Sequence, residues 1–102
     1  MNELTKRICE KMGISTSGTG KNFDFRTSPA LADLLENKMV ADGWRITVQH
    51  WLGDDGATMN VVNALAIHER FERIEIDEFA TTRPLAITEL FCRVYEIPWE
   101  AV

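Results

Sequence analysis

The sequence is poor in the residues that mark disulfide-rich, fibrous and membrane-spanning proteins. Its 102 residues include two cysteines, six glycines and three prolines. A disulfide-stabilised domain of this length normally has about four to eight cysteines, and linkers and fibres are far richer in glycine and proline. No stretch approaches the roughly 20 apolar residues that a membrane-spanning helix needs. We therefore expect a globular protein with free thiols and no membrane partner.

A secretion signal is also missing from the start of the sequence. The segment MNELTKRICEKMG mixes both charges and contains no apolar core. Together with the free thiols, this favours a protein of the reducing cytoplasm.

Positive charge is scarce over most of the chain. The formal net charge is −5, and residues 28–102 hold six bases against thirteen acids, whereas residues 1–27 hold five bases and three acids. Duplex binding depends on clustered lysine and arginine that neutralise phosphates. The larger part of the chain would repel nucleic acid, so we expect no nucleic-acid partner.

Hydrophobic residues make up 45% of the chain, which suits one small core and a single domain spanning residues 1–102. Their spacing predicts helices over 3–13, 28–42 and 82–97. Gly13 is a natural helix end, and Ser28-Pro29 and Thr82-Arg83-Pro84 are helix starts. The second helix is expected to bury Leu31, Leu34, Leu35 and Met39.

Alternating side chains predict strands over 44–52, 59–68 and 73–79. Residues 53–56, GDDG, form a turn of hairpin type between the first two. The second strand has one large face and one small face, the latter carrying Val62, Ala64 and Ala66. The order α-α-β-β-β-α predicts an α+β fold, a three-stranded antiparallel meander packed by helices in a layered α/β sandwich.

The segment from Ser15 to Asn22 resembles a nucleotide-binding P-loop only superficially. A P-loop follows a strand, precedes a helix and places a hydroxyl beside its lysine. Here a helix precedes, FDFRTSP follows, and Asn22 stands where the hydroxyl is needed. We interpret the segment as a flexible loop. Its functional alternative is an anion site formed by the backbone and lysine of Gly18, Gly20 and Lys21.

Catalytic and metal-binding patterns are weak. His50 and His68 lie near strand ends, and Asp54, Asp55 or Glu69 could complete a metal site, but the spacing matches no ligand motif. Cys9 and Cys92 lie on amphipathic helices, where small packing residues are common. We therefore expect no catalytic residue, no bound metal and no cofactor. The alternative is a small metal-dependent hydrolase that uses His50 and His68.

An acidic segment follows the second strand, with two arginines interleaved. Solvated charges on a strand face discourage edge-to-edge pairing, which is the interpretation we favour. An acidic nucleic-acid mimic, with carboxylates spaced like phosphates, is a further alternative. The carboxylates are Glu69, Glu72, Glu75, Asp77 and Glu78.

Aromatic residues point to a contact surface. Trp51 alternates onto the strand face opposite Trp44, and it marks an interface if no helix covers that face. Three tryptophans and five phenylalanines exceed what one helical layer on three strands readily covers. We therefore predict a homodimer that buries Trp51 or the Pro98-Trp99 segment.

Three stretches of the chain resemble the small phage proteins grouped as the phage ABA-sandwich domain. Residues 4–13, LTKRICEKMG, are similar to the family's opening helix, L-x-x-x-V-A-E-K-V-M-G. The helix that runs into Gly43-Trp44 is similar to its helix-to-strand unit, and RPLAI at 83–87 is similar to its A-P-L-A-I-C helix start. The chain departs from the family at Ile14, where an aromatic is common, and at Thr88, where cysteine is usual.

The resemblance implies a layered α/β fold encoded by a phage or prophage, and no reaction. We therefore expect a small accessory protein of the host-cell cytoplasm that acts by binding rather than catalysis. Its partner would be a host protein or an anionic small molecule. One concrete form is an inhibitor of a host defence protein, or a sponge for its nucleotide messenger.

Overall fold

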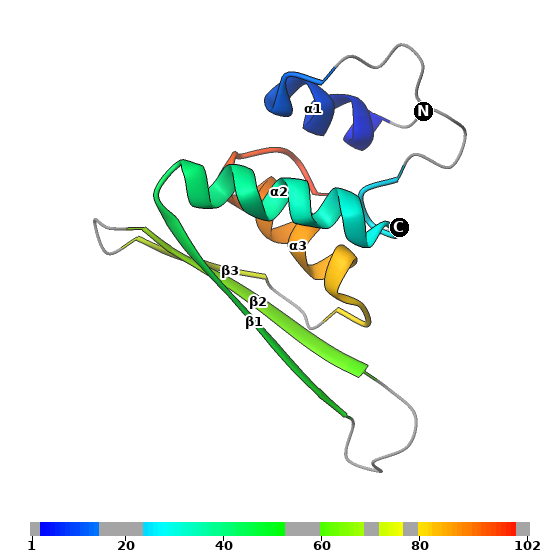
Figure 1. Ribbon diagram of the computed structural model, residues 1–102, viewed down its shortest axis with the longest axis vertical. Coiled ribbons are helices and arrows are strands. Elements are labelled where there is room, and N and C mark those ends of the chain that lie inside the picture. Colours follow the sequence, from blue (N-terminus) through cyan, green and yellow to red (C-terminus); the bar gives the residue numbers. More distant parts are fainter. Residues whose placement is uncertain (1–2, 15–23, 53–59, 69–71, 77–79, 100–102) are drawn as a thin grey trace.

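A computed structural model describes residues 3–14, 24–52, 60–68, 72–76 and 80–99 of the chain (Figure 1). Side chains are described in these ranges except for residues 50–52, 60 and 61. Along the chain, the elements are α1 (Glu3–Met12), α2 (Pro29–Ala41), β1 (Trp44–Leu52), β2 (Asn60–His68), β3 (Arg73–Glu75) and α3 (Arg83–Val94). The predicted α-α-β-β-β-α order and α+β class are confirmed.

The three strands form an antiparallel sheet in the order β1-β2-β3. β1 pairs with β2 over nine residues, from Trp44 opposite His68 to Leu52 opposite Asn60. β3 ends at Glu75, and residues 77–79 of the predicted strand lie outside the described residues. An isolated bridge between Val62 and Ala80 continues the pairing along the edge of β2 that faces β3.

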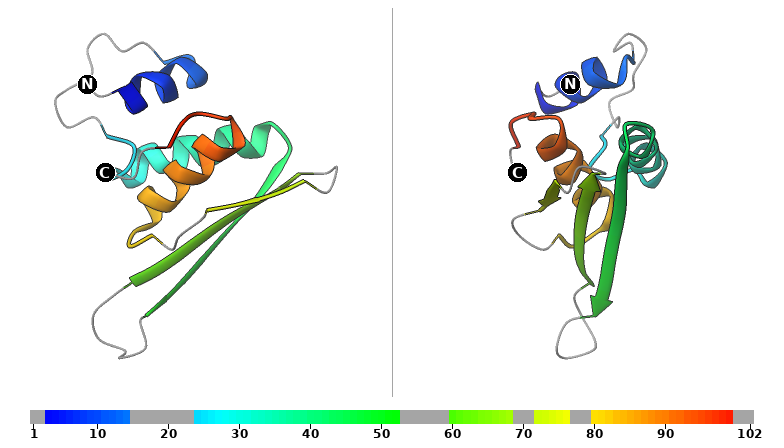
Figure 2. Two further views of the ribbon diagram at one scale, coloured as in Figure 1. Left: turned by 180° about the vertical axis from the view of Figure 1, so that it is seen from behind. Right: turned by 90° about the vertical axis from the view of Figure 1, so that its left-hand side faces the viewer.

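The helices lie on one side of the sheet, in two layers (Figures 1 and 2). α2 packs over β1, and α3 packs over β2 and β3. α1 lies on the side of these helices that faces away from the sheet (Figure 2). Because α3 is enclosed between the sheet and α1, every residue from Ala86 to Cys92 is buried.

Local chemistry fixes the starts of α2 and α3 and the end of α1 where the sequence predicts them, whereas α3 ends at Val94, before the predicted limit at residue 97. Ser28 Oγ accepts from the Leu31 amide, and Thr82 Oγ1 accepts from the Leu85 amide, both at 3.3 Å. Both α2 and α3 have proline in the first turn, where a missing N–H costs nothing. α1 ends at Gly13, whose φ of +72° is a left-handed conformation that glycine adopts without strain.

One detail of the packing differs from expectation. Leu34 is 44% exposed rather than buried, and Ala32 is fully buried instead. A small side chain at this position lets α2 approach its neighbours closely. On β2 it is likewise the small face, Val62, Ala64 and Ala66, that is wholly buried under the helices.

Candidate functional site: the open face of the sheet

One face of the sheet is not covered by any helix of the described chain (Figure 2). Its side chains come from alternate residues of the three strands. In the centre, on β2, Leu65 is half-buried and Ile67 is 39% exposed. Around them lie the flanking residues of β1 and β3, which are exposed: Arg45, Thr47, Gln49, Arg73 and Glu75.

A polar network joins the three strands across this open face. Asn63 on β2 is only 5% exposed. Its Nδ2 donates to Glu75 Oε1 on β3 at 2.6 Å and to Gln49 Oε1 on β1 at 3.4 Å. Arg73 Nη2 donates in turn to Glu75 Oε2 at 3.4 Å. These contacts hold the polar side chains beside Leu65, so the surface is ordered before any partner arrives.

A tight corner joins α2 to β1. Gly43 lies in this corner with φ of +97°. The ring of His68, at the end of β2, packs edge-on against Trp44 with centroids 5.1 Å apart. A Cβ on Gly43 would come within 3.1 Å of His68 Nε2. His68 therefore fills a packing position next to the corner.

We expect Gly43→Ala to lower the free energy of unfolding by about 1–3 kcal/mol, because it combines a left-handed backbone with a steric clash. Gly13→Ala is the matched control, since its φ is also positive but a Cβ there meets nothing within 4 Å. Urea denaturation measures both variants. Equal losses would contradict the role of the His68 contact.

The predicted site residues fall mostly outside the described side chains. Gly18, Gly20 and Lys21 lie outside the described residues. Trp51 lies in β1 opposite Val61, but its side chain is not among those described. Trp99 is half-buried and packs against the core of its own chain. The predicted ligand and interface roles stay predictions.

The arrangement of the described residues offers little for catalysis. No three histidine, cysteine, aspartate or glutamate side chains gather as a metal site within the described ranges. The side chain of His50 lies outside them. Cys9 and Cys92 are buried free thiols, and burial raises both pKa values, that of Cys92 to about 12. A neutral buried thiol is a poor nucleophile, which agrees with a packing role.

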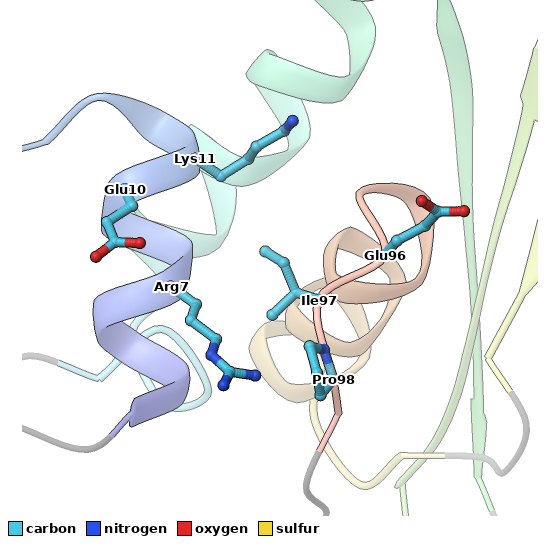
Figure 3. Close-up of a pocket in the computed structure, with 6 residues that line it drawn as sticks. All are labelled: Arg7, Glu10, Lys11, Glu96, Ile97 and Pro98. Atoms are coloured by element: carbon cyan, nitrogen blue, oxygen red, sulfur yellow. The ribbon is translucent and has the colours of Figure 1, made fainter.

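A shallow hollow of about 410 Å³ lies between α1 and the segment after α3 (Figure 3). Arg7 extends toward Ile97 and Pro98, while Glu10 and Glu96 point away from the centre (Figure 3). Arg7 Nε also donates to Glu3 at 3.2 Å. With two bases and two acids on its rim, the hollow has no charge preference that would select an anion.

A second polar cluster, which the sequence did not predict, joins all three helices. The Tyr95 hydroxyl at the end of α3 donates to the Asp42 carboxylate at the end of α2. Lys38 Nζ donates to the same carboxylate at 3.2 Å. Lys11 Nζ from α1 lies 5.1 Å from the centre of the Tyr95 ring. The hydrogen bonds from Tyr95 and Lys38 lower the pKa of Asp42, whereas burial, then Asp42, raises that of Tyr95.

Comparison with known proteins gives no relative for this chain. No family model matches the sequence, and neither a curated protein nor a solved structure matches it. Within the described residues, no helix is both long and apolar enough to cross a membrane.

Proposed function

We propose that this chain is a small binding protein without catalytic activity, and that a protein partner docks on the open face of its sheet. The observation that carries the proposal is the pair Leu65 and Ile67 at the centre of a face that no described helix covers. Apolar residues framed by polar and charged ones are the usual composition of a protein interface.

The preorganised network strengthens this proposal. Asn63, Gln49 and Glu75 are held by hydrogen bonds around the apolar centre. Side chains fixed in advance lose less entropy on binding. The resemblance to phage ABA-sandwich proteins leads us to propose a phage or prophage accessory protein of the host cytoplasm, acting on a host protein. A homodimer is part of the same proposal.

The expected anionic ligand is the second form of this proposal. It depends on Gly18, Gly20 and Lys21, for which the structure supplies no contact. The hydrolase alternative gains no support from His68, which packs against Trp44. The nucleic-acid mimic gains none from Glu75, whose carboxylate is occupied by Asn63 and Arg73.

Ile67→Asp should weaken partner binding at least about tenfold, since desolvating an introduced carboxylate in an interface costs more than about 1.4 kcal/mol. Leu34→Asp is the matched control, because Leu34 is similarly exposed but lies on α2. A photo-crosslinking residue at position 67 identifies the partner in host lysates. Titration calorimetry with the purified partner then compares the two variants.

The affinities of these two variants distinguish docking on the open face from docking elsewhere. Loss of affinity for Ile67→Asp alone supports docking on the open face. Equal affinity of both variants and the unchanged chain overturns it, as does the absence of crosslinked products from several hosts.

A further inference from the structure

β1 is an edge strand whose outer side has no neighbour among the described residues. The sheet order β1-β2-β3 leaves it at the border over its full nine residues. Natural proteins usually protect such an edge with lysine, proline, a bulge or a short strand. The sequence WRITVQHWL contains no lysine, proline or glycine, and Arg45 is its only charged residue. The edge is therefore long and chemically suited to pairing.

The hydrogen bonds of β2 show which residues of β1 direct their backbone outward. Val62 exchanges both backbone hydrogen bonds with Ala80, at 2.9 and 2.8 Å, and the Ala64 carbonyl accepts from Ile76. Even-numbered residues of β2 thus use their backbone groups on the β3 side. Odd-numbered residues of β2 must then bond to β1, where they face Arg45, Thr47 and Gln49.

The even-numbered residues of β1 consequently present N–H and C=O groups at the free edge. Ile46 and Val48 are two of these residues, and their side chains pack against the core beneath α2. Their side chains are thus held while their backbone groups remain available. A second strand can add to this edge without disturbing the β1–β2 pairing.

We propose that β1 pairs with β1 of a second copy, antiparallel about a two-fold axis at Val48, to form a continuous six-stranded sheet. This inference deepens the proposed function by assigning the homodimer a defined interface separate from the open face. Val48 is the middle residue of the nine. An axis there pairs the whole strand and sets outward-facing Val48 directly against Val48 of the second copy.

This register also brings compatible side chains together on the open face. Thr47 lies opposite Gln49 of the second copy, so two polar side chains meet. The two copies of Arg45 are six residues apart along the strands, or about 20 Å, at which like charges repel little. Because the pairing is symmetric, it closes at two chains and leaves no further β1 edge.

The size of this contact predicts a weak dimer. Nine residues span about 30 Å, and a sheet border about 10 Å deep then buries roughly 300 Å² on each copy. Stable interfaces bury about 800 Å² on each partner, so we expect a dissociation constant of the dimer in the micromolar range or above. Sedimentation should therefore be run from about 5 µM to 1 mM, the range in which such a dimer assembles.

Val48→Pro tests the pairing because it removes an outward N–H and leaves the bonds to β2 intact. Val48→Ala is the matched control: it loses the same packing but keeps the N–H. We expect Val48→Ala to dimerise like the unchanged chain, and Val48→Pro to have a dissociation constant at least about tenfold higher, with unchanged circular dichroism. A monomeric unchanged chain at 1 mM, or equal dissociation constants for Val48→Pro and Val48→Ala, overturns the proposal.

A disulfide test gives an answer even if Val48→Pro fails to fold. Thr47→Cys and Gln49→Cys are made separately, mixed and oxidised, with buried Cys9 and Cys92 left in place. Directly opposite Cβ atoms lie about 5 Å apart and diagonal ones about 7–8 Å, so the mixture should form about fivefold more linked dimer than either variant alone. Equal yields overturn the register. Ile67→Asp should leave this yield unchanged, so failure here and failure of open-face docking give different results.

Discussion

Phe25→Ala is expected to lower the free energy of unfolding by about 3–5 kcal/mol, the range for truncating a fully buried phenylalanine. Phe25 lies outside every helix and strand, yet it is only 1% exposed and belongs to the main core cluster. A chain of this size has a total stability of about 5–15 kcal/mol, so the loss is a large fraction. Thermal unfolding followed by circular dichroism should show a midpoint lower by roughly 15 °C or more.

The backbone of Phe25 is anchored as firmly as its side chain. Thr88 Oγ1, in the buried middle of α3, lies 2.9 Å from the Phe25 carbonyl and donates to it, or to the Pro84 carbonyl at 2.7 Å. Two controls separate ring packing from general damage. Phe25→Leu keeps most of the volume and should cost clearly less, and Leu34→Ala, on the exposed side of α2, should cost about 1 kcal/mol or less. Equal losses for the three variants would contradict a core role for the Phe25 ring.

Features that depend on neighbouring residues were the ones that the sequence predicted well. Ser28-Pro29 and Thr82-Arg83-Pro84 are helix starts because cap and first turn lie within a few residues. The meander order followed from the alternation of three adjacent strands. That order already places β1 at an edge. The sequence does not say which backbone groups of β1 face outward. The hydrogen bonds of Val62 and Ala64 in the structure show it.

Features that depend on distant segments were missed. Phe25 follows a segment rich in serine, threonine and glycine, and no local pattern indicates that it enters the core. Leu34 was expected inside because its spacing places it on the apolar stripe of the helix, but it is 44% exposed and Ala32 is buried instead. Thr88 is buried, and its hydroxyl lies within hydrogen-bond distance of the Phe25 and Pro84 carbonyls, which belong to two segments. Each outcome depends on how the helices and the sheet pack together. The periodicity of a single segment carries no information about that packing.

The cluster of Tyr95, Asp42, Lys38 and Lys11 shows the same limit and has a measurable consequence. Its members come from three helices that are far apart in the sequence. Tyr95 is the only tyrosine of the chain, so its ionisation can be followed alone by absorbance at 295 nm. Phenolate formation there would place a second negative charge against the Asp42 carboxylate, in a partly buried setting.

We therefore expect Tyr95 to ionise well above the ordinary tyrosine pKa of about 10, and the fold to weaken as the pH rises past that value. Burial and the Asp42 hydrogen bond raise the folded-state pKa of Tyr95. A raised folded pKa means that the folded state holds its proton more tightly than the unfolded chain. The contribution is thus fully present below pH 10 and is lost as pH rises toward the folded pKa, by at most about 1.4 kcal/mol per pH unit for one proton.

Two variants test this assignment. Tyr95→Phe removes the titrating group, so its stability should change less between pH 9 and pH 11 than that of the unchanged chain, as measured by urea denaturation. Asp42→Asn keeps a hydrogen-bond acceptor but removes the charge, so the 295 nm midpoint should move down toward the ordinary value. Lysine and arginine titrations are common to all three proteins and cancel in the comparison. A midpoint near pH 10 in the unchanged chain, or an identical pH dependence for Tyr95→Phe, would show that the Tyr95–Asp42 contact does not join α2 to α3 in solution.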